Sequence, residues 1–143
     1  MPYEFLQGVA MADIAFHAWG KTLNGLFEAA SEAMLNIMVD NPKAVEPEVN
    51  REIFLQAETE QMLLFSLLEE LIYYKDAQRL LLRINHGSLE DSNGLLAYTV
   101  LASGEQINPE KHKLALDVKA VTMHLFNLYR KEDAWHCTVV LDV

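Results

Sequence analysis

Two aspartates and a lysine interrupt apolar stretches of this sequence, and these three residues could carry chemistry. Asp13 lies in MADIAF, Asp142 lies in VVLDV, and Lys119 lies in DVKAVTMH. A buried carboxylate without a partner costs free energy, because it loses its hydration. Each aspartate is therefore expected at the end of a strand or beside a cation.

Spacing alone leaves three interpretations of the aspartates open. With the α-carboxylate of Val143, Asp13 and Asp142 would form an all-oxygen site, which favours calcium, magnesium or manganese over zinc. Lys119 could instead form an ion pair with one of the two aspartates. Simple exposure of both carboxylates at strand ends is favoured over either of these.

The stretch AFHAWGKT (15–22) ends in Gly20-Lys21-Thr22, between an expected strand and an expected helix. That is the context of a phosphate-binding loop, and Asp142 after an apolar strand could then hold magnesium. Aromatic residues inside the stretch argue against it, because small residues are needed for backbone N–H groups to curl around phosphate. A turn at Gly20 and a helix cap at Thr22 are therefore favoured, and a nucleotide-binding protein stays an alternative.

The cysteine and the histidines offer little further chemistry. Cys137 is the only cysteine, and it shares a predicted strand face with apolar residues, so a structural role is expected. The five histidines form no spacing typical of a zinc site. We expect His124 and His136 to face each other across the last hairpin.

Composition narrows the class of protein. The chain has 143 residues, 51% of them hydrophobic, so one folded domain over residues 1–143 is expected. The net charge of −10 disfavours tight, direct nucleic-acid binding and favours a cation or a basic protein as partner. No apolar segment reaches the ~20 residues that cross a bilayer, and the start lacks signal-peptide features. We expect a cytoplasmic protein without a membrane partner.

In the first half of the chain, the elements that must position these residues are strands alternating with helices. Hydrophobic periodicity predicts strands at 12–18 and 52–58. Helices are predicted after Thr22 and after Thr59, both of which can serve as N-caps, and Pro42 ends the first helix.

The second half is predicted to be mostly β. Asn93-Gly94 indicates a hairpin between 79–84 and 95–102. Asn108-Pro109 indicates a short helical turn, and RKED indicates a hairpin between 117–129 and 134–143. The predicted fold class is α/β (α+β): a two-layer sandwich with two amphipathic helices packed on one mixed β-sheet.

Along its whole length the sequence resembles the archease family. The matching stretches are MADIAFHAWGKTLNGLFEAASEAM, GEQINPEKHK, and DVKAVT followed by a terminal VVLDV. The resemblance implies a non-enzymatic cofactor protein that activates an RtcB-type RNA ligase, by promoting its guanylylation and turnover in tRNA splicing and RNA repair. A chaperone-like interaction module is the second function that the family suggests.

The resemblance also implies roles for single residues. Asp13 matches the aspartate of a His-Thr-Ala-Asp motif, and with Asp142 and the carboxylate of Val143 it would bind a divalent cation. Lys119 matches the lysine of the KAVT motif and would belong to the same functional patch. We therefore expect the last hairpin to bring Lys119 near Asp142, with that aspartate opposite Val121 rather than Thr122.

This sequence departs from the family pattern at four positions near the expected site. Ala10 and Met11 replace the histidine and threonine of the first motif. Met123 replaces a tyrosine after KAVT, and Leu125 replaces a glycine.

Overall fold

The structure is a computed structural model that describes residues 2–7 and 13–143, and it confirms the α+β class. In chain order the elements are β1 (Tyr3–Leu6), β2 (Asp13–Gly20), α1 (Leu23–Met38), the 3₁₀ helix η1 (Pro42–Ala44), β3 (Val49–Ala57), α2 (Glu60–Gln78), β4 (Leu80–Ser92), β5 (Leu95–Gln106), α3 (Pro109–His112), β6 (Ala120–Lys131) and β7 (Ala134–Asp142).

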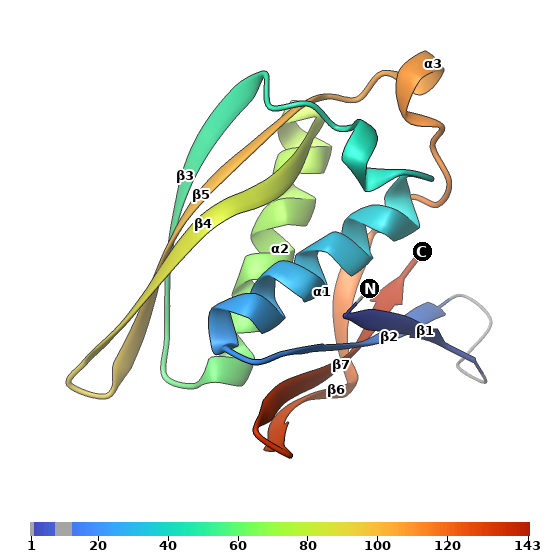
Figure 1. Cartoon of the computed structure of the whole chain (residues 1–143). Helices are drawn as coiled ribbons and strands as arrows, with labels where there is room; N and C mark the ends of the chain where they lie inside the picture. Colours follow the sequence, from blue (N-terminus) through green and yellow to red (C-terminus); the bar gives the residue numbers. More distant parts are fainter. Residues whose placement is uncertain (1, 8–12) are drawn as a thin grey trace.

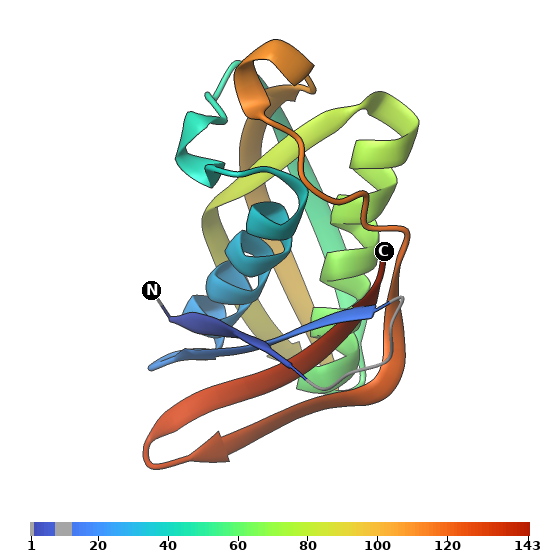
Figure 2. The ribbon, with the colours of Figure 1, turned by 90° about the vertical axis from the view of Figure 1, so that its right-hand side faces the viewer.

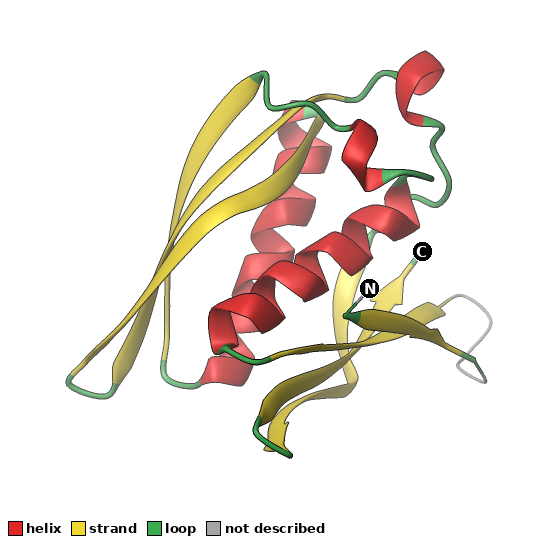
Figure 3. Cartoon of the chain, viewed as in Figure 1, coloured by secondary structure: helices red, strands yellow, loops and turns green. Residues whose placement is uncertain are grey.

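The described strands form two antiparallel sheets (Figures 1 and 3). One has the order β1-β2-β7-β6 and the other the order β3-β5-β4. The prediction of one mixed sheet is wrong in this respect. The segment β2-α1-β3 looks in sequence like a crossover within a sheet, but here it passes from one sheet to the other. The first and last strands of the chain thereby come together in one sheet.

Helices α1 and α2 lie between the two sheets (Figures 1 and 2). Helix α1 contacts β2 and β4, and α2 contacts β6, β3 and β4. Each helix therefore buries side chains against both sheets, in a core that includes Phe16, Leu26, Phe27, Met34, Leu63, Leu67, Leu81, Tyr98, Val139 and Leu141. No described helix is long and apolar enough to cross a membrane.

The predicted helix caps and the turn at Asn93-Gly94 are confirmed. The hydroxyl oxygens of Thr22 and Thr59 accept hydrogen bonds from Gly25 N and Met62 N, at 2.9 and 3.1 Å. Asn108 caps α3. Asn93 and Gly94 have positive φ angles, as the two-residue hairpin turn requires.

The last hairpin pairs differently from the prediction. Glu132 and Asp133 both have positive φ and form a two-residue turn, with Lys131 paired to Ala134. The register then shifts between Thr122 and Asn127, where β6 bulges. As a result Asp142 lies opposite Ala120, and neither Val121 nor Thr122 is its partner.

Candidate functional site

The two aspartates singled out in the sequence are cross-strand neighbours. Asp13 begins β2 and Asp142 ends β7, and the register pairs them directly. Residues directly opposite in an antiparallel pair point to the same face, with Cβ atoms about 4.5–5.5 Å apart. The fold thus brings together two carboxylates that are 129 positions apart, and both side chains are half-buried.

The face that carries this pair is the one turned away from the helices. Phe16 and Ala18 of β2 are fully buried in the core beside α1. Because side chains alternate along a strand, Asp13 and His17 lie on the opposite face. The acidic pair is therefore on the outer face of the four-stranded sheet.

Lys119 meets Asp142 through its backbone. Its N–H donates a 2.8 Å hydrogen bond to the carbonyl oxygen of Asp142. The predicted diagonal placement of the lysine side chain on the face of Asp142 is not found, because the register puts Ala120 opposite that aspartate. The lysine side chain is exposed just before the start of β6.

A buried lysine of α2 holds the segment that leads into Lys119. Lys75 Nζ donates to the Asp117 carboxylate and to the Val118 carbonyl, both at 2.6 Å, and it also pairs with Asp76. Burial by itself lowers the pKa of Lys75, but the hydrogen bonds to Asp117 and Asp76 outweigh it and raise that pKa. The charged ammonium thus anchors the residues directly before Lys119.

The acidic pair offers two anionic oxygen donors, the type that a hard cation prefers. Two carboxylates directly opposite one another repel, and among the described residues neither forms a salt bridge. Within that same part of the chain, no cluster of three or more His, Cys, Asp or Glu side chains is arranged to hold a metal. A cation here would therefore need a further ligand beyond these side chains, and the family's His-Thr positions, Ala10 and Met11, lie outside the described residues.

The fold argues against a phosphate-binding loop at residues 15–22. Residues 15–18 are paired to both β1 and β7, so their backbone N–H groups belong to a sheet and form no loop. A Cβ at Gly20 would lie 2.5 Å from Leu26 N, so this glycine allows α1 to pack closely against β2. Thr22 caps that helix, as predicted.

Cys137 is structural, as predicted. It is fully buried on the core face of β7. Burial raises the pKa of its thiol to about 12, so the nucleophilic thiolate is scarce at neutral pH.

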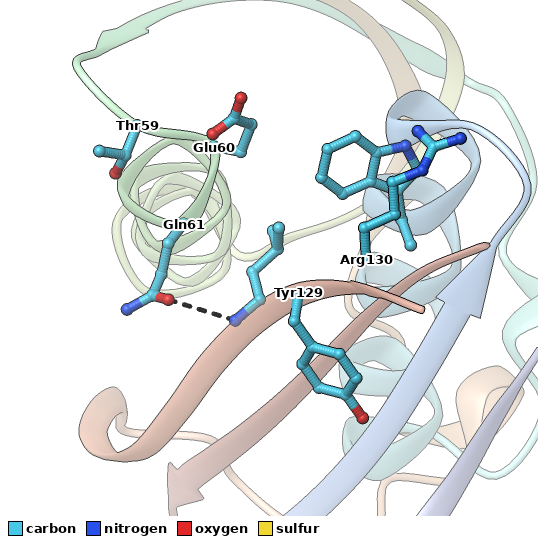
Figure 4. Close-up of a pocket in the computed structure, with 7 residues that line it drawn as sticks. Thr59, Glu60, Gln61, Tyr129 and Arg130 are labelled. Atoms are coloured by element: carbon cyan, nitrogen blue, oxygen red, sulfur yellow. Dashed lines mark hydrogen bonds between the residues drawn. The ribbon is translucent and has the colours of Figure 1, made fainter. Parts of the chain in front are cut away.

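A groove of about 450 Å³ lies between the start of α2 and the β6–β7 hairpin (Figure 4). Gln61 Oε1 accepts a 3.2 Å hydrogen bond from the Leu128 N–H, and the Arg130 guanidinium lies 5.2 Å from the ring centroid of Trp135. The groove lies near the start of β7, whereas Asp142 ends that strand. It therefore adds no residue to the acidic pair.

The sequence interpretation missed the partner of His136. His124 falls in the β6 bulge and does not face His136. The register pairs His136 with Tyr129 instead. The ring of His136 instead meets His17 of the neighbouring strand β2, with 3.0 Å between Nδ1 and Nε2. Alternation predicts that His17 and His136 lie on the outer face, but only the pairing of β2 with β7 brings them together.

Comparisons with known proteins match nearly the whole chain and point to one family. The model of the Archease protein family (MTH1598/TM1083) matches residues 3–143. An archease of Methanosarcina acetivorans is 34% identical over 142 residues, covering 99% of this chain and 95% of the relative. An archease of Pyrococcus furiosus is 34% identical over 133 residues, covering 92% and 93%.

Two solved structures share the fold. The solution structure of protein 1598 of Methanobacterium thermoautotrophicum has a TM-score of 0.86 and 29% identity, with 99% of each chain covered. The crystal structure of a Thermotoga maritima protein, described as an archease and possible chaperone, has a TM-score of 0.61 and 17% identity, with 98% of each chain covered. With the family model and the relatives matching nearly end to end, this chain belongs to the archease family.

Proposed function

We propose that this protein is a non-enzymatic, metal-binding activator of an RtcB-type RNA ligase, and that it promotes guanylylation and turnover of that enzyme. The observation that carries the proposal is the direct pairing of Asp13 with Asp142, beside the backbone of Lys119. Residues from three distant parts of the sequence meet there, at one end of the sheet. They are the residues that the family resemblance assigns to one functional patch.

The proposed metal ligands are the carboxylates of Asp13 and Asp142 and the α-carboxylate of Val143. Val143 directly follows β7, so its carboxylate is close in the chain to the paired side chains. An all-oxygen, anionic donor set suits calcium, or magnesium or manganese. When bound, the ion supplies positive charge that offsets the repulsion between the two carboxylates.

A protein partner suits the surroundings of this patch. Met123 and Leu125 in the β6 bulge are 54% and 59% exposed, and they follow the KAVT stretch directly. Exposed apolar side chains on an irregular segment of this kind suit contact with another protein. The net charge of −10 disfavours the alternative that this surface binds RNA directly.

The test is reconstitution with an RtcB-type RNA ligase from the same organism. The rate of ligase guanylylation with labelled GTP and the number of ligation turnovers would be measured with and without this protein. Wild-type protein should increase both. Asp13→Asn and Asp142→Asn should lower divalent-cation affinity by about tenfold or more and reduce the stimulation in parallel.

Asp91→Asn is the matched control, because Asp91 is an exposed aspartate of the other sheet. It should leave cation affinity and stimulation unchanged. A wild-type protein that does not stimulate the ligase would refute the partner. Full stimulation by Asp142→Asn would refute a role for the acidic pair.

A further inference from the structure

Four side chains form a row across all strands of the four-stranded sheet. Glu4 of β1, His17 of β2, His136 of β7 and Tyr129 of β6 contact one another in that order. The row lies on the outer face, as alternation from the buried Phe16 requires. The function proposed above assigns no role to the four residues of this row.

The centre of the row is a pair of imidazoles from neighbouring strands. His17 Nε2 and His136 Nδ1 are 3.0 Å apart, and the two rings are nearly parallel, at 5°. Two nitrogens bound to one ion, with metal–nitrogen bonds of about 2.0–2.1 Å, lie about 2.8–3.0 Å apart at a right angle and about 3.3–3.4 Å apart at a tetrahedral angle. The observed separation is compatible with two ligands at a right angle, whereas the 5.2 Å between the ring centroids leaves the two nitrogens facing each other directly, as in a hydrogen bond.

The Glu4 carboxylate orients the imidazole of His17 on the side away from His136. Glu4 Oε1 lies 3.3 Å from His17 Nδ1, where it can accept a hydrogen bond from that nitrogen and leave Nε2 as the ligand atom. A histidine that binds a metal usually donates its other N–H to a carboxylate in this way, which fixes the tautomer and raises the basicity of the ligand. This contact is independent of the pairing between the two rings.

We propose that His17 and His136 form a binding site for an imidazole-preferring divalent transition-metal ion such as nickel, copper or zinc. Its two protein ligands are His17 Nε2 and His136 Nδ1, Glu4 supports the first of them, and water completes the coordination. The site is distinct from the acidic pair, because nitrogen ligands select these metals whereas carboxylates select calcium or magnesium.

Ion binding here requires only local changes. Both facing nitrogens must present lone pairs to the ion, so each imidazole must carry its proton on the other ring nitrogen. A turn of the two rings then directs both lone pairs at one point. The His17 side chain is 21% exposed, so an ion can reach it from solvent. The rings of Trp19 and Tyr129, each 5.2 Å from an imidazole centroid, flank the site.

The test is calorimetric titration of the untagged, full-length protein with nickel chloride. Wild-type protein should bind one nickel ion per chain. His17→Gln and His136→Gln should each weaken binding by about tenfold or more, and Glu4→Gln by about tenfold, as loss of a supporting carboxylate does. Nickel should also raise the melting temperature of the wild type, because the ion binds only the paired strands.

Two control variants separate this site from other histidines and from the acidic pair. His86→Gln removes an exposed imidazole of β4, and Asp142→Asn removes one carboxylate of the acidic pair; both should retain wild-type nickel affinity. The proposal would be overturned by the absence of saturable nickel binding, since the two rings then share only a hydrogen bond. Undiminished binding by His136→Gln would overturn it equally.

Discussion

Asp13 and Asp142 face each other across the central strand pair β2–β7, 129 positions apart in sequence and directly opposite in the sheet. Like charges at directly opposite positions destabilise an antiparallel pair, and among the described residues no basic side chain is bonded to either carboxylate. The fold therefore keeps an unfavourable charge pair that a bound cation would turn into a favourable one.

Neutralising one member of this pair should change stability in opposite directions with and without metal. Asp142→Asn should stabilise the metal-free protein by about 0.2–1 kcal/mol, because it removes the repulsion. On the proposal that the pair binds calcium, the same variant should lose most of the stabilisation by calcium that is expected for the wild type, since a ligand is missing. Urea unfolding in chelator and in excess calcium measures both effects. A metal-free variant that is less stable than the wild type would show that the carboxylates do not repel.

The Lys75 ammonium should be needed to hold the segment before Lys119. Lys75→Met leaves the buried Val118 carbonyl without its donor, which should cost about 1–3 kcal/mol. Amide hydrogen exchange at Lys119 should accelerate, because its bond to Asp142 depends on the position of this segment. Lys43→Met, at an exposed lysine, is the control and should change neither quantity. Unaltered exchange at Lys119 in Lys75→Met would rule out the anchoring role.

Leu125 stores backbone strain in the β6 bulge. Its φ angle is 56°, in the left-handed region that disfavours side chains with a Cβ, and it is 59% exposed. Leu125→Gly should therefore raise the free energy of unfolding by about 0.5–1 kcal/mol.

Met123 offers a matched comparison in the same bulge. It is similarly exposed but is not among the residues with positive φ. Met123→Gly should lower the free energy of unfolding by about 0.5–1 kcal/mol, because glycine there only adds freedom to the unfolded chain. Thermal unfolding of the two variants should show opposite shifts; a loss of stability in both would refute strain at Leu125.

Stability should fall in acid partly through Glu105. Burial works to raise the pKa of this carboxyl, but hydrogen bonds from Lys111 and His112 and from the Glu46 backbone outweigh it and lower the pKa to about 2 from 4.5. A folded pKa below the unfolded one contributes stability above about pH 4.5, and that contribution disappears as the pH falls toward about 2.

Glu105→Gln tests this dependence. The variant should be less stable than the wild type at neutral pH, and the difference should shrink between about pH 4.5 and pH 2. Glu52→Gln, at an exposed position of β3, should follow the wild-type pH profile. Chemical denaturation at a series of pH values provides the comparison. A constant difference across this range would contradict the lowered pKa.

Local features of the fold could be predicted from the sequence, because each depends on a few neighbouring residues. Thr22 and Thr59 cap their helices, Pro42 cannot continue α1, and Asn93-Gly94 suits the turn between β4 and β5. Cys137 is buried because alternation along β7 puts it on the apolar face. The short strand β1 was missed, since four residues carry too little periodicity.

Pairings between distant strands were decided only by tertiary structure. Periodicity does not say which sheet a strand joins, so the division into two antiparallel sheets was not predicted. The turn at Glu132 and Asp133 would by itself pair Asp142 with Met123, and the bulge in β6 shifts the pairing by three residues to Ala120, so the predicted Val121 is not the partner.

The candidate sites likewise combine residues that the sequence singles out with contacts that only the tertiary structure decides. The sequence singles out Asp13, Asp142 and Lys119, because a charged side chain in an apolar strand costs free energy unless it is solvated or has a partner. That Asp13 lies opposite Asp142, and that His17 meets His136, follows from the pairing of β2 with β7. No short-range pattern encodes that pairing, because it depends on both strands burying their other face against α1.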